Sequence, residues 1–114
     1  APVTTDNSYL TTGTWSYGRA FRSPTGNVRC VFNRSIVTLI CSSNALRQRV
    51  IMNSWGDLTV RGGVVRAVGP RLRYGDYWSP SRNSAFACQS QVSGVICVGP
   101  GNAAFKIKLS GIYG

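Results

Sequence analysis

Hydrophobic and polar residues alternate in short runs along most of this chain, and glycine and proline punctuate the runs. Val, Ile, Thr, Tyr, Phe and Trp dominate between the breaks, and these residue types favour β-strands. Alternation with a period of two is typical of strands that bury one face. The pattern predicts strands at residues 8–17, 28–32, 37–41, 58–61, 64–68, 85–89, 94–98 and 103–109.

Helix signals are nearly absent. Only residues 44–52 are compatible with a helix, which Asn44 would cap, and a strand fits that stretch equally well. Gly62-Gly63 between two β-type runs predicts a two-residue hairpin turn. Closely spaced short strands predict an all-β domain, either a compact antiparallel barrel or a two-sheet sandwich.

The length of 114 residues fits one domain. We expect a β core over residues 19–114, and residues 1–18 are a candidate for a loosely attached N-terminal strand. Ala1-Pro2-Val3 is interpreted as a mature end left after removal of a signal peptide. The longest apolar run, residues 36–41, is far shorter than the roughly 20 residues of a membrane span, so no transmembrane segment is expected.

Part of the sequence repeats after 56 residues. The recurring positions are Ser23-Pro24, Asn27 and Ile40-Cys41, which match Ser79-Pro80, Asn83 and Ile96-Cys97. The repeat predicts two related hairpin units, at about residues 21–43 and 77–109, each carrying its own disulfide.

Four cysteines allow three pairings, and we predict Cys30 with Cys41 and Cys88 with Cys97. Each pair brackets a short polar stretch flanked by β-type residues. A hairpin about that stretch brings the two Cα atoms within the ~5.5–6 Å that a disulfide accepts. Metal binding, redox exchange and nucleophilic catalysis are weaker alternatives, because short Cys spacings and histidine partners are missing. An even cysteine count indicates an oxidising compartment and thus a secreted protein.

Nearly all the charge has one sign. Eleven Arg and two Lys face only Asp6, Asp57 and Asp76, which gives a net charge of +10. Such a field attracts polyanions, and arginine makes planar, bidentate contacts to phosphate or carboxylate. The alternative is that the surplus charge serves only to keep the protein in solution.

The chain has no histidine and no carboxylate cluster. The usual general base near neutral pH is therefore missing, and neither a Ser-His-Asp nor a Cys-His arrangement can form. We expect no enzymatic activity, no catalytic residue, no metal and no cofactor.

The segment 66–82 is the most suggestive stretch for binding, because arginines alternate there with flat rings. Its candidate residues are Arg66, Arg71, Arg73, Tyr74, Tyr77, Trp78 and Arg82. Cations interleaved with aromatic rings suit nucleic acids and anionic polymers. The alternative is a turn-rich connection whose rings pack on the sheet under arginine stems. A second basic cluster comprises Arg19, Arg22, Arg29 and Arg34, and alternation with Cys30 places Arg29 on the outward face.

The cysteine-bearing segments resemble a family of small secreted actinobacterial domains of unknown function. The matching stretches are Phe21-Arg22-Ser23-Pro24-Thr25-Gly26-Asn27-Val28-Arg29-Cys30, Leu39-Ile40-Cys41, Leu72-Arg73-Tyr74-Gly75, Trp78, Phe86-Ala87-Cys88, Gly94-Val95-Ile96-Cys97 and Ala104-Phe105. The likeness covers about residues 21–109 and departs from the family pattern at Gly99-Pro100-Gly101. It implies secretion, four paired cysteines and a β fold, and it implies no activity.

These observations favour a secreted, cationic, non-enzymatic binding protein with a toxin-like character. Its partner would be anionic and outside the cell: an envelope polymer, a nucleic acid or an acidic protein surface. Three other functions stay open. They are an inhibitor of a secreted hydrolase, a self-assembling subunit whose residues 1–17 add to a neighbour's sheet edge, and, least favoured, a histidine-free nuclease.

Overall fold

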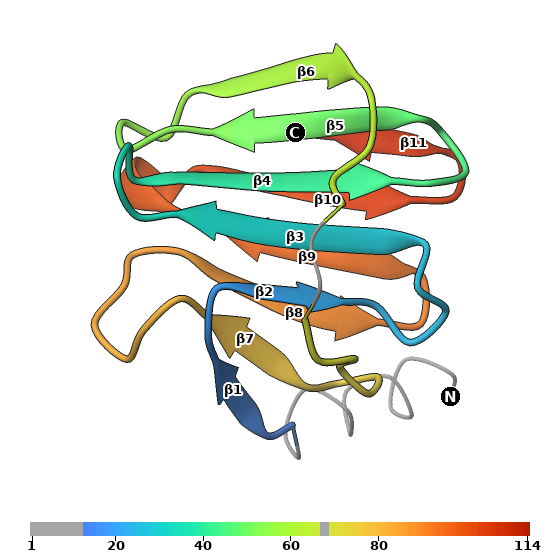
Figure 1. Cartoon of the computed structure of the whole chain (residues 1–114), viewed down its shortest axis with the longest axis horizontal. Helices are drawn as coiled ribbons and strands as arrows, with labels where there is room; N and C mark the ends of the chain where they lie inside the picture. Colours follow the sequence, from blue (N-terminus) through green and yellow to red (C-terminus); the bar gives the residue numbers. More distant parts are fainter. Residues whose placement is uncertain (1–12, 67–68) are drawn as a thin grey trace.

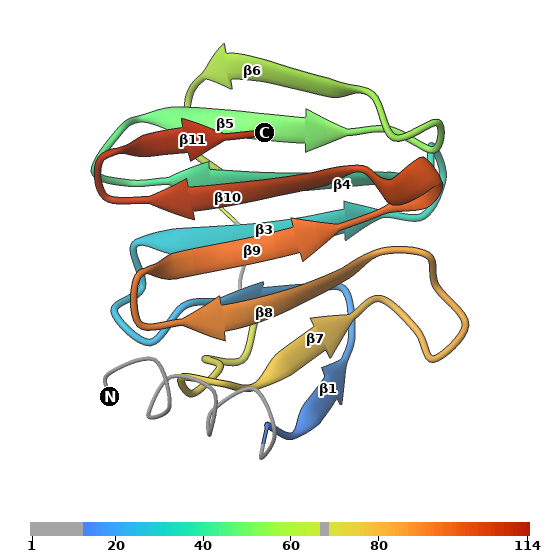
Figure 2. The same cartoon turned by 180° about the vertical axis from the view of Figure 1, so that it is seen from behind.

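The fold is a sandwich of two β-sheets packed face to face (Figure 1 and, from behind, Figure 2). The computed structural model describes residues 13–66 and 69–114. One sheet has five strands in the order β2 (Ala20–Arg22), β3 (Val28–Asn33), β4 (Thr38–Ser43), β5 (Gln48–Met52) and β6 (Leu58–Gly62). The other has six, in the order β1 (Trp15–Tyr17), β7 (Tyr77–Ser79), β8 (Ala87–Gln91), β9 (Gly94–Val98), β10 (Ala104–Lys108) and β11 (Gly111–Tyr113). The all-β expectation is confirmed, and the architecture is the sandwich rather than the barrel.

Each sheet is built mainly from strands that follow one another along the chain. Strands β2 to β6 pair antiparallel with their successors, and so do β7 to β11. Each run of five strands has one disulfide, between its second and third strands. This shared layout is compatible with the two hairpin units expected from the sequence, and the relatedness of the units stays a prediction.

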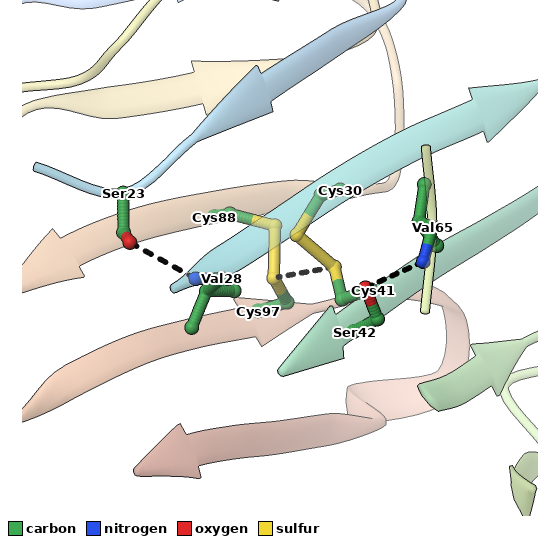
Figure 3. The surroundings of a disulfide bond; sticks show 8 residues. All are labelled: Ser23, Val28, Cys30, Cys41, Ser42, Val65, Cys88 and Cys97. Carbon is green, nitrogen blue, oxygen red and sulfur yellow. Dashed lines mark hydrogen bonds between the residues drawn. A yellow bond between two sulfur atoms is a disulfide. The ribbon is translucent and has the colours of Figure 1, made fainter. Parts of the chain in front are cut away.

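Two disulfides lie at the centre of the sandwich (Figure 3). The predicted pairs, Cys30–Cys41 and Cys88–Cys97, are the pairs present. In each pair the Cα atoms are 4.0 Å apart, closer than expected, because the two cysteines sit directly opposite each other on adjacent strands. The Sγ atoms of Cys41 and Cys97 approach to 3.9 Å across the gap between the sheets. The disulfides therefore pack on each other as part of the core.

Large side chains continue the core on both sides of the sulfurs. The rings of Phe21 and Trp78 lie 4.8 Å apart, and those of Phe32 and Phe86 lie 5.2 Å apart. The other large, fully buried residues include Leu39, Val50, Met52, Val95, Phe105 and Ile107. Because Trp78 has no exposed surface, its ring belongs to the core and is not available to a ligand.

Residues 44–52 form a turn followed by β5, so the strand alternative is the correct one for Gln48–Met52. Asn27 explains the turn: its Oδ1 accepts a hydrogen bond from the N–H of Ala45 at 2.8 Å, and its Nδ2 donates to Ser43 Oγ at 3.2 Å. Within the described residues the one helical element is a short 3-10 turn, Pro100–Asn102. No described helix has the length and apolar character that would let it span a membrane.

The strand predicted at residues 64–68 and the hairpin at Gly62-Gly63 are wrong. β6 ends at Gly62, and residues 64–66 are not in a strand, while residues 67–68 lie outside the described part. Instead of turning back, the chain crosses over the outer face of the five-stranded sheet (Figure 1). The N–H of Val65 donates to Ser42 Oγ at 2.7 Å, so β4 ties this segment to the sheet through a side chain.

Of the strand predicted at residues 8–17, only Trp15–Tyr17 falls in the described part as a strand, and residues 8–12 lie outside it. This strand, β1, pairs in parallel with β7, with Trp15 beside Tyr77. Gly13 approaches the carbonyl of Gly75 so closely that a Cβ atom would collide with it. β1 is therefore a member of the six-stranded sheet.

Removing one disulfide should cost substantial stability. For the double variant Cys88→Ala with Cys97→Ala we expect a loss of about 3 kcal/mol in the free energy of unfolding, the loop-closure value for a loop of this size. Urea unfolding of the variant and of the native protein measures the difference. A loss under about 1 kcal/mol would show that the second disulfide contributes little beyond its neighbour.

Two tryptophans provide a matched pair for testing the core. Trp78→Phe removes part of a buried ring, whereas Trp55→Phe changes a side chain that is 82% exposed. Trp78→Ala should lower the free energy of unfolding by about 3–5 kcal/mol, with Trp78→Phe in between, because a buried ring leaves a cavity. Trp55→Ala should stay within about 0.5 kcal/mol. Equal effects at the two positions, measured by urea unfolding, would contradict the placement of Trp78.

Candidate anion-binding surface

A row of arginines crosses the outer face of the five-stranded sheet. Cys30 and Cys41 point into the core, so their neighbours Arg29 and Ser42 point outward. The strand register then continues the row in both directions. The pairs are Arg22 with Arg29, Arg29 with Ser42, Ser42 with Arg49, and Arg49 with Arg61, and an isolated bridge adds Arg71 beside Arg22. We call Arg71, Arg22, Arg29, Arg49 and Arg61 the arginine row.

The spacing of the row follows from the sheet itself. Neighbouring strands lie ~4.8 Å apart, so six successive positions span roughly 24 Å. Ser42 is the one position of the six without a charge. The arginines therefore lie along a line across the strands, and the line is interrupted at Ser42, which is fully buried and accepts a hydrogen bond from the N–H of Val65.

The charges of the row have no acidic partner among the described residues. The acids in this part of the chain are Asp57 and Asp76, and Asp76 Oδ2 pairs with Nε of Arg73 at 3.4 Å. Nε atoms of three row members, Arg22, Arg29 and Arg49, are buried and lack hydrogen-bond partners. Like charges held side by side repel each other, so a bound anion would relieve a cost already present in the fold.

The chain that leaves β6 runs along this surface. We call residues 63–66 and 69–72 the crossover segment. Gly63 N–H donates to the carbonyl of Arg47, and Arg22 exchanges backbone hydrogen bonds with Pro70 and Leu72. Gly69 packs so tightly on the backbone of Ala20 that a Cβ atom would collide with it. Arg22, Arg29 and Arg49 are only half-buried, so they retain exposed surface beside this segment.

The sequence-predicted site residues are dispersed by the fold. Arg71 joins the arginine row, and Arg66 lies exposed on the crossover segment. Arg73 is exposed and pairs with Asp76. Tyr74 is 38% exposed and lines a cavity of about 500 Å³ at one end of the sandwich. Segment 66–82 therefore does not form one surface.

Tyr77 and Arg82 belong to a different surface, on the edge of the six-stranded sheet. The ring of Trp15 stacks on Tyr77 at 4.8 Å and on Tyr17 at 6.1 Å, and the Arg82 guanidinium lies 5.6 Å from the Tyr17 ring centre. Trp15 and Tyr17 nevertheless stay 47% and 45% exposed. The contact between Trp15 and Tyr77 helps to hold β1 against β7.

The row contains arginines that sequence reasoning did not group. Arg22 and Arg29 were recognised as one basic cluster, with Arg29 outward, but Arg49 and Arg61 were not joined to them. The available signal was the alternation in Gln48–Met52, where Val50 and Met52 turn inward and Arg49 outward. That signal was lost because the stretch was equally compatible with a helix.

Two further features, the cysteine cluster and the cavity beside Tyr74, were considered as possible sites of chemistry. Among the described residues, the one group of three or more metal-ligand side chains is the four cysteines, and all of them are held in disulfides. The 500 Å³ cavity is lined mainly by turn residues, including Ser23, Asn27 and Val92, and Lys108 is the charged residue in its wall. Neither feature supplies the acid and base pair that hydrolysis needs.

Comparisons with protein-family models, with curated proteins and with solved structures return no match. No relative therefore lends this chain a substrate, a partner or a set of catalytic residues. What can be inferred about function comes from the surface of the chain itself, and the arginine row is its most distinctive feature.

Proposed function

We propose that this chain is a secreted, cationic, non-enzymatic binding protein, and that the arginine row binds an anionic partner outside the cell. The partner would be an envelope polymer, a nucleic acid or an acidic protein surface, and a toxin-like role fits all three. One observation carries the proposal. The fold gathers arginines from β2, β3, β5, β6 and the crossover segment into one line, with no acidic partner among the described residues.

The geometry favours a linear partner. Each guanidinium offers a planar fork of donors that matches a phosphate, sulfate or carboxylate group. Successive anionic groups on a chain can meet Arg71, Arg22 and Arg29 on one side of the buried Ser42. Others can meet Arg49 and Arg61 on the other side. Three of its members are anchored by half-buried stems, which reduces the side-chain entropy lost on binding.

Two disulfides support the extracellular setting of the proposal, because such bonds persist mainly in oxidising compartments. The family resemblance described for residues 21–109 also implies secretion. The non-enzymatic character is supported by the chemistry of the chain, which lacks histidine and has only three acidic residues. Asp57 lies in the turn before β6 and Asp76 is occupied by Arg73, so neither is part of a carboxylate pair in the described structure.

The salt dependence of binding tests this proposal. If four members of the row contact a nucleic acid, the slope of log K against log salt should be about −3 to −4. The double variant Arg22→Gln with Arg29→Gln should weaken binding to double-stranded DNA and to heparin, and should flatten the DNA slope by about two units.

The matched control removes the same charge elsewhere. Arg73→Gln with Arg82→Gln changes one arginine paired with Asp76 and another that lies over Tyr17, both outside the row. This control should retain most of the affinity and the slope. Equal losses in the two double variants would mean that the positive charge acts collectively and that no row-specific site exists. Tight binding of a protein partner that ignores salt would favour the inhibitor alternative.

A further inference from the structure

The five-stranded sheet ends at β6, and no other strand of the described residues pairs with this edge. All five residues of β6 are exposed. Backbone hydrogen bonds join Gly63 to Arg47 and Asn53 to Asp57. Hydrogen-bonded and non-hydrogen-bonded positions alternate along an antiparallel pair. Gly63 and Asp57 are at hydrogen-bonded positions, so Arg61 and Thr59, two residues further along from each, also bond to β5. Leu58, Val60 and Gly62 therefore direct their N–H and C=O groups away from the sheet.

The inner side of β6 is apolar and only partly covered, with Gly114 lying beside the side chain of Leu58. Leu58 and Val60 pair with Met52 and Val50, which are both buried in the core. Leu58 is nevertheless 37% exposed and Val60 51% exposed. The reason is the offset of the two sheets: β6 extends beyond β11, the last strand of the facing sheet (Figure 1, Figure 2). A strand added beside β6 would thus gain apolar contacts as well as backbone hydrogen bonds.

An exposed tryptophan lies at the start of this edge. Trp55 is 82% exposed, in the turn between β5 and β6. Asn53 holds that turn, since its Oδ1 accepts hydrogen bonds from the N–H groups of Trp55 and Asp57, both at 2.9 Å. Gly56 packs against the carbonyl of Pro100 so closely that a Cβ atom would collide with it. An indole presented on a rigid turn is the kind of side chain that anchors protein interfaces.

We propose that the edge of β6 is a docking site for an extended, acidic segment of a partner protein, which adds to the five-stranded sheet as a sixth strand. Backbone hydrogen bonds to Leu58, Val60 and Gly62 would hold the segment. Its inward side chains would be apolar and would cover Val60. Its outward side chains would lie beside Arg61, with Arg49 one strand further in.

The positive charge of Arg61 favours an acidic segment. A side chain directly opposite Arg61 on an added strand would have its Cβ ~4.5–5.5 Å from that of Arg61. A glutamate or aspartate there meets a cation that has no acidic partner among the described residues. Asp57 lies at the other end of the edge, so the acidic positions of the segment should cluster toward Gly62.

A second copy of this chain fits the edge poorly. Antiparallel pairing of two β6 strands about Val60 would bring Arg61 and Arg49 of both copies onto one face, between molecules that each carry a net charge of +10. Arginine at an open edge is a recognised protection against such self-pairing. The site shares Arg61 with the arginine row, but it is carried by the free backbone and the apolar flank and does not rest on polyanion binding.

The first experiment uses an end-capped peptide, Val-Glu-Val-Glu-Val-Glu, titrated into isotopically labelled protein and followed by nuclear magnetic resonance. We expect saturable shifts centred on β6, and amide hydrogen exchange slowed at least tenfold at Leu58 and Val60. The same peptide with N-methyl groups on the residues that face β6 should bind at least tenfold more weakly, because it cannot complete the ladder. This comparison leaves the protein unaltered.

Variants of the protein give an independent test. Val60→Pro removes an edge donor that makes no bond to β5, so the fold should survive and DNA binding should persist. Peptide binding should fall at least tenfold, whereas the control Val60→Thr should retain it. The proposal is overturned if N-methylation and Val60→Pro leave peptide binding unchanged, or if only Arg22→Gln with Arg29→Gln removes it, since the peptide would then be binding the arginine row. Sedimentation that shows a dimer dissociated by Val60→Pro would assign the edge to a second copy instead.

Discussion

The contact between the two disulfides is the interaction on which the rest of the structure depends. Cys41 and Cys97 meet at 3.9 Å between the sheets, and each is covalently joined to the neighbouring strand of its own sheet. Two hairpins are thereby closed and held face to face at one point. In a domain of this size the apolar core is modest, and two such crosslinks offset much of the missing burial. They also offset the self-repulsion of a chain with a net charge of +10.

The same contact determines which residues lie on the outer face of the five-stranded sheet. Side chains alternate along a strand, so a cysteine that points inward sends both of its neighbours outward. Arg29 and Ser42 are outward for this reason, and the register of β5 and β6 brings Arg49 and Arg61 into line with them. A register slip of one residue would bury arginines and expose the disulfide. The strand register that packs the core therefore also fixes the position of the arginine row.

Features that depend on residues close together in the sequence were predicted correctly. Features that depend on contacts between distant segments were missed. The disulfide pairs, the sandwich option and the outward position of Arg29 follow from spacing and alternation within a hairpin. The strand expected at residues 64–68 was wrong in its described part, because this stretch is held on the outer face of the sheet by a side chain: the N–H of Val65 donates to Ser42 Oγ across 23 positions of sequence. Trp78 was predicted as a ligand contact, yet it lies in the core against Phe21. Alternation of Arg and aromatic residues in segment 66–82 did not reveal which strand each residue would meet.

The offset between the sheets explains why the two ends of the sandwich differ. On one side the rings of β1 and β7 pack on each other, with Trp15 6.1 Å from Tyr17 and 4.8 Å from Tyr77. On the other side β6 has no facing strand among the described residues, and Leu58 and Val60 stay partly exposed although their partners in β5 are buried. A long exposed edge is a hazard for aggregation unless charge protects it or a partner covers it. Arg61 supplies the protection against like-charged copies, and the same charge makes the edge selective for an acidic strand.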